Sequence, residues 1–464
     1  MNNKNIESIK PAAKPGLHSS TENIAKEYLK ETVKKRLKFL ISSQNWSKKK
    51  IREYQFLELK KLLINSFKNV PFYRREFEKI KFNPFKFSKL EEIKRLPVID
   101  KKIVIQNHKE FIAENIDFKN LSYMTTGGST GNPLKIIMNS EIRSLAHANT
   151  QFYMQIAGFK LNNEKSVRLH GNQISDELIK KKQYWYFENN RLIMSVYHIS
   201  ELTCSAYLNV INKFNPSYIH SYPSAIYLLT RLAKRNNYKF PKSVKAIFCD
   251  SETLYPEQKT AIETYFKIKV FNTYGHTEGA VLGITYPNSN DIELVPQIGL
   301  TEILNCSGHI ADTKDTQGNI VVTGFNNHIF PLIRYDTKDI GIIKNKDKGN
   351  IKYLSLKCIL GRTQDYLISN VKEIVPAAPF LFDYNFDWSG IQQFQLYQDT
   401  PGLIIVRIVK DNNSLNLEQK IMARFSEVLK KGFVIKVMIV REINKTAIGK
   451  FRYVDQRLNV EDYI

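Results

Sequence analysis

A run rich in glycine and hydroxyl side chains, set between two apolar stretches, constrains this chain more than any other segment. Residues 123–135 read Tyr-Met-Thr-Thr-Gly-Gly-Ser-Thr-Gly-Asn-Pro-Leu-Lys. Leu121 and Tyr123 come before the glycines, and Ile136 and Ile137 follow them, so we expect a loop between two strands. Glycine lets a backbone approach a ligand closely, and consecutive N–H groups beside hydroxyls bind anions. The loop therefore predicts a polyphosphate ligand.

An ordinary flexible hairpin is the alternative interpretation of this loop. The loop is not a P-loop, because that motif requires Gly-Lys-Ser/Thr leading directly into a helix. Here Gly131 is followed by Asn132 and Pro133, and residues 134–138 have the composition of a strand. The run does not fit Gly-x-Gly-x-x-Gly either. A bound nucleotide is therefore expected at a loop that joins two strands.

The length of 464 residues predicts two or three domains. No apolar run approaches the ~20 residues that cross a bilayer, and the polar first fifteen residues do not resemble a signal peptide. The four cysteines are scattered and form no Cys-x-x-Cys pair, which favours a reducing cytoplasm. Cys306 and His309 have a spacing that metal ligands use, but without a second pair they are a weak indication of a metal.

A net charge of +24, from 69 Lys and Arg against 45 Asp and Glu, favours anionic partners. Nucleotides, coenzyme A, anionic membranes and nucleic acid are the classes that fit. A biased genome is the other explanation, since Lys, Asn and Ile are abundant and the lysines are spread along the chain. The helical pattern near the N-terminus has a basic face, so contact with a membrane surface stays open. A monomer and a homodimer are equally compatible with the sequence.

Three regions follow one another along the chain. Residues 1–20 are polar and are expected to be disordered, and residues 21–120 are expected to be mainly helical, with helices at 22–40 and 47–67. Pro71 is expected to end the second of these helices. Residues 121–361 are predicted to form an α/β core of mixed or parallel strands flanked by helices. A small α+β domain is predicted at 365–464, with a hinge near 362–365.

Within the core, strands and helices alternate. Strands are predicted at 217–220, 244–249 and 270–274, and helices at 224–236 and 256–266, with Ser224 as an N-cap. In the small domain, strands are predicted at 391–397, 403–409 and 434–440, and a helix at 415–430.

The segment Asn272–Gly279 follows a predicted strand. Glu278 at the carboxyl end of a strand can hold Mg²⁺ near phosphates, and Tyr274 can stack on a base. An ordinary turn is the alternative. The segment Ile333–Gly341 places Asp336 and Asp339 in a predicted loop, where a carboxylate can accept both hydroxyls of a ribose.

An Asx turn with a surface ion pair to Arg334 is the alternative for this second segment. Gly361–Asp365 lies at the boundary before the small domain, as a hinge would. Near the C-terminus, the segment Thr446–Arg452 presents Lys450 beside a glycine, and a lysine there can neutralise developing negative charge.

Together these five segments, in this order, resemble the acyl-adenylate-forming (AMP-binding) superfamily. Within it the chain looks most like the phenylacetate–CoA ligase branch, which includes members associated with capsule and polysaccharide biosynthesis. The segment Asn69–Tyr73 is also similar to that branch. The resemblance covers roughly residues 50–455. It implies the fold of these enzymes: a large N-terminal domain of mixed sheets and helices, and a small mobile α+β C-terminal domain.

The resemblance implies roles in binding ATP. Tyr274 would contact the adenine side, Thr277 a phosphate, and Asp339 the ribose hydroxyls with help from Arg362. Gly275 would also bind the nucleotide. The residues expected to wrap the phosphates are Thr125, Thr126, Gly127, Gly128, Ser129, Thr130 and Gly131.

The resemblance also implies roles in catalysis and motion. Glu278 would bind Mg²⁺, Lys450 would stabilise charge as the carboxylate attacks the α-phosphate, and Gln364 would be the hinge. The residues expected to line the pocket for the acid are His220, Tyr222 and His276.

The chain departs from the family pattern in several places. Gln364 stands where an acidic residue or lysine is usual, Asn132 stands where a lysine is usual, and Gly127 replaces a common hydroxyl residue. The usual proline before the terminal lysine is missing. These departures leave the rate and the acceptor open.

The expected activity is adenylation of a carboxylic acid by ATP and Mg²⁺ with release of pyrophosphate, followed by transfer to coenzyme A. The close alternative is transfer to an amine or hydroxyl of a sugar precursor. A basic nucleic-acid-binding protein is an alternative from another class, although the sequence contains no recognisable motif of that class. A non-catalytic scaffold of the same fold is the last alternative. The identity of the acid stays open.

Overall fold

The structure is a computed structural model, and it describes most of the chain. The described residues are 9–11, 22–126, 134–159, 164–287, 289–305, 307–311, 313–345, 354–362, 366–377, 390–410, 416–428, 432–446, 449–458 and 460–463. The chain divides into two compact units: Met1–Leu161 with Thr273–Cys358, and Asn162–Asn272 with Ile359–Ile464. The domain boundaries and the hinge near 362–365 remain predictions, and residues 363–365 lie outside the described part.

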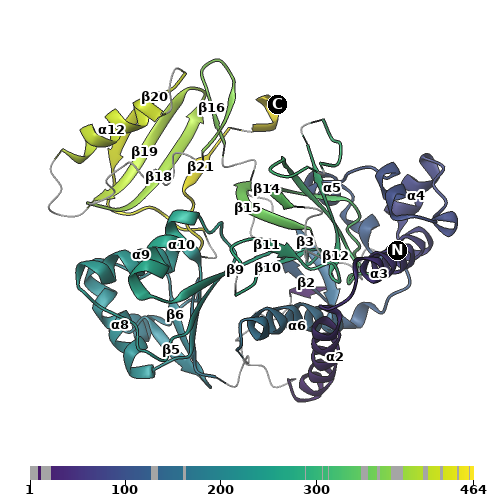
Figure 1. The fold of residues 1–464 in the computed structure, drawn as a ribbon, viewed down its shortest axis with the longest axis horizontal. Helices are drawn as coiled ribbons and strands as arrows, with labels where there is room; N and C mark the ends of the chain where they lie inside the picture. The colour runs from purple at the N-terminus through teal and green to yellow at the C-terminus, as the bar shows by residue number, and fades with distance from the viewer. Residues whose placement is uncertain are drawn as a thin grey trace. The chain divides into compact units, whose positions relative to one another are not determined.

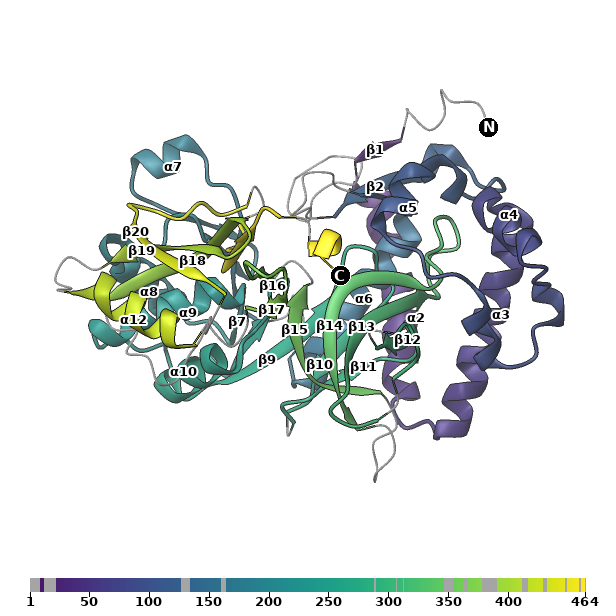
Figure 2. The same ribbon diagram turned by 90° about the horizontal axis from the view of Figure 1, so that it is seen from above.

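Helices and 3-10 turns dominate the first part of unit 1 (Figure 1). Its α-helices are α2 Glu22–Ser43, α3 Lys48–Asn69, α4 Pro71–Lys79, α5 Lys101–Gln106 and α6 Ser140–Ile156. Ser47 caps α3, because its side chain accepts the N–H of Lys50. Pro71 was expected only to end a helix, but it begins α4 at the first turn, where its missing N–H is harmless. Helices α2 and α6 pack side by side, as both ribbon views show (Figures 1 and 2).

Two sheets complete unit 1. The first pairs β1 (Lys10–Pro11) in parallel with β2 (Leu121–Thr125), which pairs antiparallel with β3 (Lys135–Asn139). The second sheet has the order β12-β13-β14-β15-β11-β10, followed by the end of β9. Its strands are β9 Lys269–Gly275, β10 Leu282–Thr285, β11 Ile292–Leu294, β12 Gly299–Leu304, β13 Gln317–Gly324, β14 Tyr335–Asn345 and β15 Ser355–Arg362.

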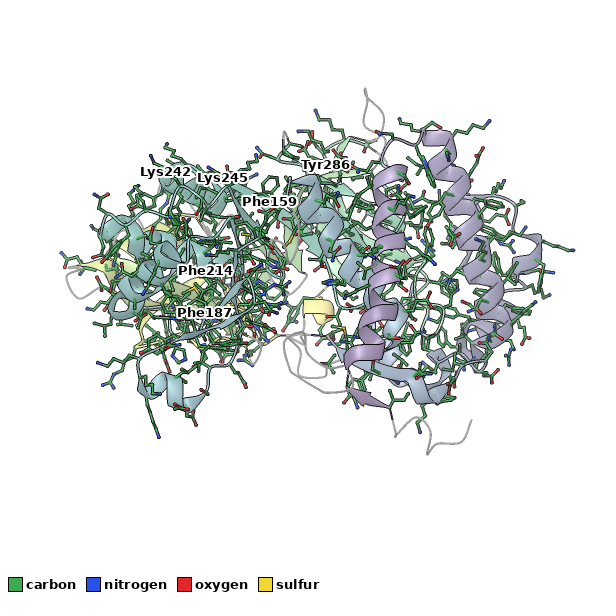
Figure 3. The ribbon with its side chains drawn as sticks, turned by 90° about the horizontal axis from the view of Figure 1, so that it is seen from below. Phe159, Phe187, Phe214, Lys242, Lys245 and Tyr286 are labelled. Carbon is green, nitrogen blue, oxygen red and sulfur yellow. The ribbon has the colours of Figure 1, made fainter. Side chains whose placement is uncertain are left out.

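Unit 2 contains a mainly parallel sheet. Strands β6, β4, β7, β8 and the start of β9 run parallel in that order, and β5 pairs antiparallel at the edge. Apolar residues of these strands and of the flanking helices form one core. The elements are β4 Ser166–His170, α7 Asp176–Lys180, β5 Trp185–Glu188, β6 Arg191–Ser195, α8 Glu201–Phe214, β7 Tyr218–Ser221, α9 Pro223–Arg235, β8 Ala246–Cys249 and α10 Pro256–Phe266. At the β5 edge the rings of Phe187 and Phe214 meet with centroids 5.6 Å apart (Figure 3).

The last part of unit 2 is a small α+β layer with the strand order β20-β19-β18-β21. Helix α12 packs against β20 (Figure 1). The elements are β16 Tyr366–Ile368, β17 Ile374–Pro376, β18 Ile391–Thr400, β19 Leu403–Lys410, α12 Leu417–Val428, β20 Val434–Ile439 and β21 Val454–Gln456. The strands and the helix predicted for this region are confirmed to within a few residues. Among the described residues, no helix is long and apolar enough to cross a membrane.

Candidate active site

The glycine loop is bounded by two paired strands. Thr125 at the end of β2 pairs with Lys135 at the start of β3. The next residue, Thr126, closes the base of the loop: its N–H donates to the carbonyl of Leu134 at 2.9 Å, and its Oγ1 accepts the N–H of Leu134 at 3.0 Å. The two strands predicted on either side of the glycine-rich run are confirmed. The predicted phosphate-binding residues Gly127, Gly128, Ser129, Thr130 and Gly131 lie outside the described residues.

Tyr274 and Asp339 lie in contact in unit 1. The hydroxyl of Tyr274, near the end of β9, donates to Oδ2 of Asp339 at 2.8 Å. Both residues are buried. A hydrogen bond to a carboxylate is stronger than a neutral one, so it holds Asp339 in one orientation. A stacking role for Tyr274 was expected, and the structure adds a positioning role that the sequence did not indicate.

Asp336 and Asp339 do not lie in a loop, as was expected, but in strand β14. The strand is irregular there: Lys338 has a φ of 62°, and the pairing with β13 shifts register nearby. The hydroxyl of Thr337 accepts the N–H of Asp339 and replaces a ladder bond. A local break in the strand therefore orients the aspartates, and a residue pattern alone does not show such a break.

The alternative ion pair between Arg334 and Asp336 is wrong. Arg334 is buried and forms a bidentate pair with Glu302, with N–O distances of 2.9 and 3.0 Å. Its Nη1 donates to the carbonyls of Lys94 and Leu96. Arg334 thus has a structural role that anchors the start of β14.

Glu278 lies in a buried polar group with two neighbours. Its Oε1 accepts the hydroxyl of Tyr335 at 3.1 Å, and its Oε2 lies 3.2 Å from Nδ1 of His276. The side chains of His276 and Glu278 are 7% and 10% exposed. Gly275 ends β9, and Thr277 is half-buried in the turn that leads to Glu278. The segment thus brings a carboxylate and an imidazole together near the carboxyl end of a strand.

Lys450 lies in unit 2, in a loop closed on itself. The N–H of Thr446 donates to the carbonyl of Lys450 at 2.9 Å, and Oγ1 of Thr446 accepts the N–H of Lys450 at 3.0 Å. The preceding Gly449 has a φ of 79°, and a Cβ there would lie 2.6 Å from the Cα of Gly171. Only glycine fits both the backbone conformation and the close approach. This explains why glycine precedes the lysine.

Glu252 fixes the same loop and was missed by the sequence interpretation. Its Oε1 accepts the N–H of Phe451 at 2.8 Å, and its Oε2 accepts the N–H of Ser224 at 3.0 Å. Burial raises the pKa of Glu252, against the effect of these hydrogen bonds. The expectation that Ser224 caps α9 is wrong, because the N-cap is Tyr222 and the N–H of Ser224 is satisfied by Glu252.

His220 and Tyr222 contact two further polar residues of unit 2. Nε2 of His220 lies 2.8 Å from Oδ2 of Asp250, and the ring of Tyr222 stacks on His170 with centroids 4.5 Å apart. Burial, and then the charges of Asp250 and Glu252, raise the pKa of Tyr222 to about 12. His170, the last residue of β4, and Asp250, the residue after β8, were missed, because only the order of the strands in the sheet brings them together.

The expected site residues therefore form two groups. Tyr274, His276, Glu278 and Asp339 gather in unit 1, and His220, Tyr222 and Lys450 gather in unit 2. The side chain of Arg362 and all of Gln364 lie outside the described residues.

Comparison with known protein families and curated proteins yields a consistent set of relatives. The family described as "AMP-binding enzyme" matches residues 87–328, and the "CapK C-terminal domain" matches residues 367–457. Protein CapK of Staphylococcus aureus is 29% identical over 352 residues, covering 75% of this chain and 76% of CapK. Phenylacetate-coenzyme A ligase of Thermus thermophilus is 24% identical over 351 residues, covering 71% and 74%.

Among solved structures, 2-hydroxyisobutyryl-CoA ligase in the postadenylation state with 2-HIB-AMP matches with a TM-score of 0.67. It is 16% identical, and the match covers 87% of this chain and 89% of that one. At this identity the likeness concerns the fold alone, and it agrees with the expected architecture of sheets, flanking helices and a small C-terminal domain. Since the AMP-binding family matches more than half of the chain, the protein belongs to the AMP-binding enzyme family and is a ligase-like, adenylate-forming member of it.

Proposed function

We propose that the protein activates a carboxylic acid with ATP, forming an acyl adenylate and pyrophosphate, and then transfers the acyl group to coenzyme A. The observation that carries this proposal is the contact between Tyr274 and Asp339, from two motif segments 65 residues apart. In this proposal an oxygen of the acid attacks the α-phosphorus of ATP, and the bond to pyrophosphate breaks. Membership of the AMP-binding family supports it.

The nucleotide is assigned to the residues that the motifs indicate. Asp339, whose carboxylate Tyr274 orients by a hydrogen bond, accepts the ribose hydroxyls. Thr277 and the loop that begins after Thr126 bind the phosphates. The hydrogen bonds between Thr126 and Leu134 support the base of this loop and fix where it leaves the sheet.

The residues around Glu278 suit a magnesium ion. Mg²⁺ prefers oxygen ligands and is commonly held by one or two carboxylates together with substrate phosphates. Glu278 offers a carboxylate, which Tyr335 orients by a hydrogen bond. When bound there, the ion supplies neutralisation of phosphate charge.

Lys450 supplies positive charge where the carboxylate meets the α-phosphate. The attack joins two anions, so neutralisation and alignment matter more than a strong base. The close approach of Gly449 to Gly171 and the bond from Phe451 to Glu252 support this role, because they hold the lysine loop in one place.

The acceptor follows from the relatives rather than from a site on the chain. The match to a phenylacetate-coenzyme A ligase supports coenzyme A, whose sulfur would attack the acyl carbon and release AMP. The alternative acceptor is an amine or hydroxyl of a sugar precursor, which the sequence leaves open. Coenzyme A is the leading proposal because its thiol needs no dedicated base.

Pyrophosphate release in a panel of carboxylic acids, with and without coenzyme A, tests both steps. The proposal predicts acid-dependent release that rises when coenzyme A is added, together with an acyl-CoA product found by mass spectrometry. Acid-dependent release that coenzyme A leaves unchanged contradicts the second step alone. No release with any acid contradicts the first step.

A further inference from the structure

Three polar side chains meet where neighbouring parallel strands of unit 2 end. His170 ends β4, His220 lies in β7, and Asp250 follows β8 directly. Strand β7 pairs in parallel with both β4 and β8, so these ends lie at one edge of the sheet. The carboxyl edge of such a sheet is where α/β proteins bind their ligands.

Two polar atoms of this cluster face each other without a hydrogen-bond partner among the described residues. They are Nε2 of His170 and Oδ1 of Asp250, and they lie 3.7 Å apart. The side chain of His170 is only 7% exposed. The other oxygen of Asp250 is bonded to His220 at 2.8 Å. A buried polar atom left without a partner costs about 1–3 kcal/mol, so such a pair is typical of a place that a ligand completes.

The protonation of the pair defines what can bind. Burial and the charge of His220 lower the pKa of His170 well below its usual value, so the ring is neutral at pH 7. Burial opposes ionisation of Asp250, but the charge of His220 and its hydrogen bond to the carboxylate outweigh it and keep the pKa of Asp250 low. The cluster therefore offers a carboxylate oxygen and an imidazole nitrogen that can accept or donate. One hydroxyl or ammonium can contact two atoms 3.7 Å apart at about 2.8 Å from each.

The loop of Lys450 lies against this cluster. Gly449 approaches Gly171, the residue after His170, and the charge of Lys450 acts on both His170 and Glu252. The proposed function places the reacting carboxylate beside Lys450. The remainder of the same acid therefore reaches the pair formed by His170 and Asp250.

We infer that the acid adenylated by this protein carries a hydroxyl or amino group on its acyl chain, and that this group binds between Oδ1 of Asp250 and Nε2 of His170. The inference rests on the proposed function. An unsubstituted aliphatic or aromatic acid would bury an ionised carboxylate against carbon, which is unfavourable. Sites built to hydrogen-bond a substrate group reject analogues that lack it far more strongly than apolar pockets discriminate.

A metal ion is the competing occupant. One ligand atom from each of His170, His220 and Asp250 lies within 4.8 Å of the others, as in a site for a divalent cation. The positive charges of Arg168 and Lys450 also act on His170, which disfavours a dication there. Metal content is therefore measured in the same experiment.

The test compares acids that differ by one group: lactate and alanine against propionate, 3-hydroxybutyrate against butyrate, and 4-hydroxyphenylacetate against phenylacetate. ATP–pyrophosphate exchange gives kcat/KM for each. We expect at least one substituted acid to exceed its unsubstituted partner by about 100-fold or more. If a hydroxy acid has the highest kcat/KM, the bound group is a hydroxyl; if an amino acid has it, the bound group is an ammonium. If the two acids of every reactive pair have nearly equal kcat/KM, the inference is wrong but the proposed function stands.

The same pairs are measured with Asp250→Asn, with His170→Gln, and with the control Asp176→Asn, which changes an exposed aspartate in α7. The first two variants are expected to lower the preference at least tenfold, and the control is expected to keep it. An unchanged ratio in Asp250→Asn overturns the inference. The inference is also wrong if the purified wild type contains one zinc ion per chain and Asp250→Asn contains none. No exchange with any acid overturns the proposed function, and this inference falls with it.

Discussion

The hydroxyl of Tyr274 donates a hydrogen bond of 2.8 Å to the carboxylate of Asp339, linking the end of β9 to the irregular part of β14. The bond holds the carboxylate of Asp339 in one orientation. It also explains why a tyrosine, rather than any aromatic residue, stands at the end of this strand.

Replacing Tyr274 by Phe is expected to raise KM for ATP about tenfold with a smaller change in kcat. A hydrogen bond to a charged group contributes about 1.5–3 kcal/mol, and 1.4 kcal/mol corresponds to a factor of ten. Steady-state kinetics with varied ATP measure the effect. Tyr397→Phe, which removes a tyrosine–aspartate bond at an exposed site in β18, is the matched control. Equal KM values in the two variants would contradict a role for Tyr274 in orienting Asp339.

Gly449→Ala is expected to lower kcat of adenylation at least tenfold, together with a loss of stability of about 1–2 kcal/mol. The alanine Cβ would meet Gly171 at 2.6 Å and would have to hold a φ of 79°, which costs about 1–2 kcal/mol. The loop would shift to relieve the contact and carry Lys450 with it. Gly308→Ala is the control, because Gly308 has a similar φ of 73° but no atom within 4 Å of the added Cβ. If both variants keep full activity, the position of the loop does not govern catalysis.

Breaking the buried pair between Arg334 and Glu302 is expected to destabilise the protein strongly. Each side chain is 7% exposed or less, and removing one partner of such a pair costs about 3–5 kcal/mol. Urea unfolding of Arg334→Met and Glu302→Gln measures the loss. Arg52→Met breaks an exposed pair with Glu91 and should cost less than about 1 kcal/mol. Similar unfolding midpoints for all three variants would show that the buried pair contributes little.

The stability contributed by Lys445 should depend on pH in the alkaline range. Burial lowers the pKa of Lys445 to about 8 from a usual 10.5, partly offset by Glu252. Between pH 8 and 10.5 the unfolded chain therefore binds more protons at Lys445 than the folded chain does. The contribution of Lys445 to the free energy of unfolding thus becomes more favourable as pH rises through that range. Urea unfolding should show that the free energy of unfolding of the wild type rises relative to that of Lys445→Met between pH 7.5 and 9.5. A difference that stays constant, or moves the other way, contradicts the lowered pKa.

The sequence predicted those parts of the fold that depend on local pattern. The strands on either side of the glycine loop, and helices such as α10 at Pro256–Phe266, follow from periodicity and from glycine and proline. Ser224 shows the limit: its type and position suit an N-cap, yet Glu252, which is distant in sequence, satisfies its N–H instead. Tertiary hydrogen bonds of this kind leave no local signal.

The motifs named Glu278 and Asp339 as candidate site residues, and their roles in binding stay predictions. Their hydrogen-bond partners Tyr335 and Tyr274 lie in other segments of the chain, and the sequence did not indicate these pairs. His170 and Asp250 were not named as candidates, because their meeting depends on β4 and β8 both pairing with β7. Polar residues at the ends of several apolar strands were the available signal, and the order of strands in a sheet cannot be read from one sequence. Arg334 is the opposite case: it lies inside a functional motif, but its buried ion pair with Glu302 gives it a structural role.

The central claim is that Lys450 acts on a carboxylic acid as it reacts with ATP. Acid-dependent ATP–pyrophosphate exchange of Lys450→Ala, compared with the wild type and with the exposed lysine variant Lys420→Ala, tests it most directly. The account predicts a loss of at least 100-fold in Lys450→Ala, with Lys420→Ala unchanged and unfolding midpoints equal in all three proteins. An exchange rate in Lys450→Ala that matches the wild type would contradict it.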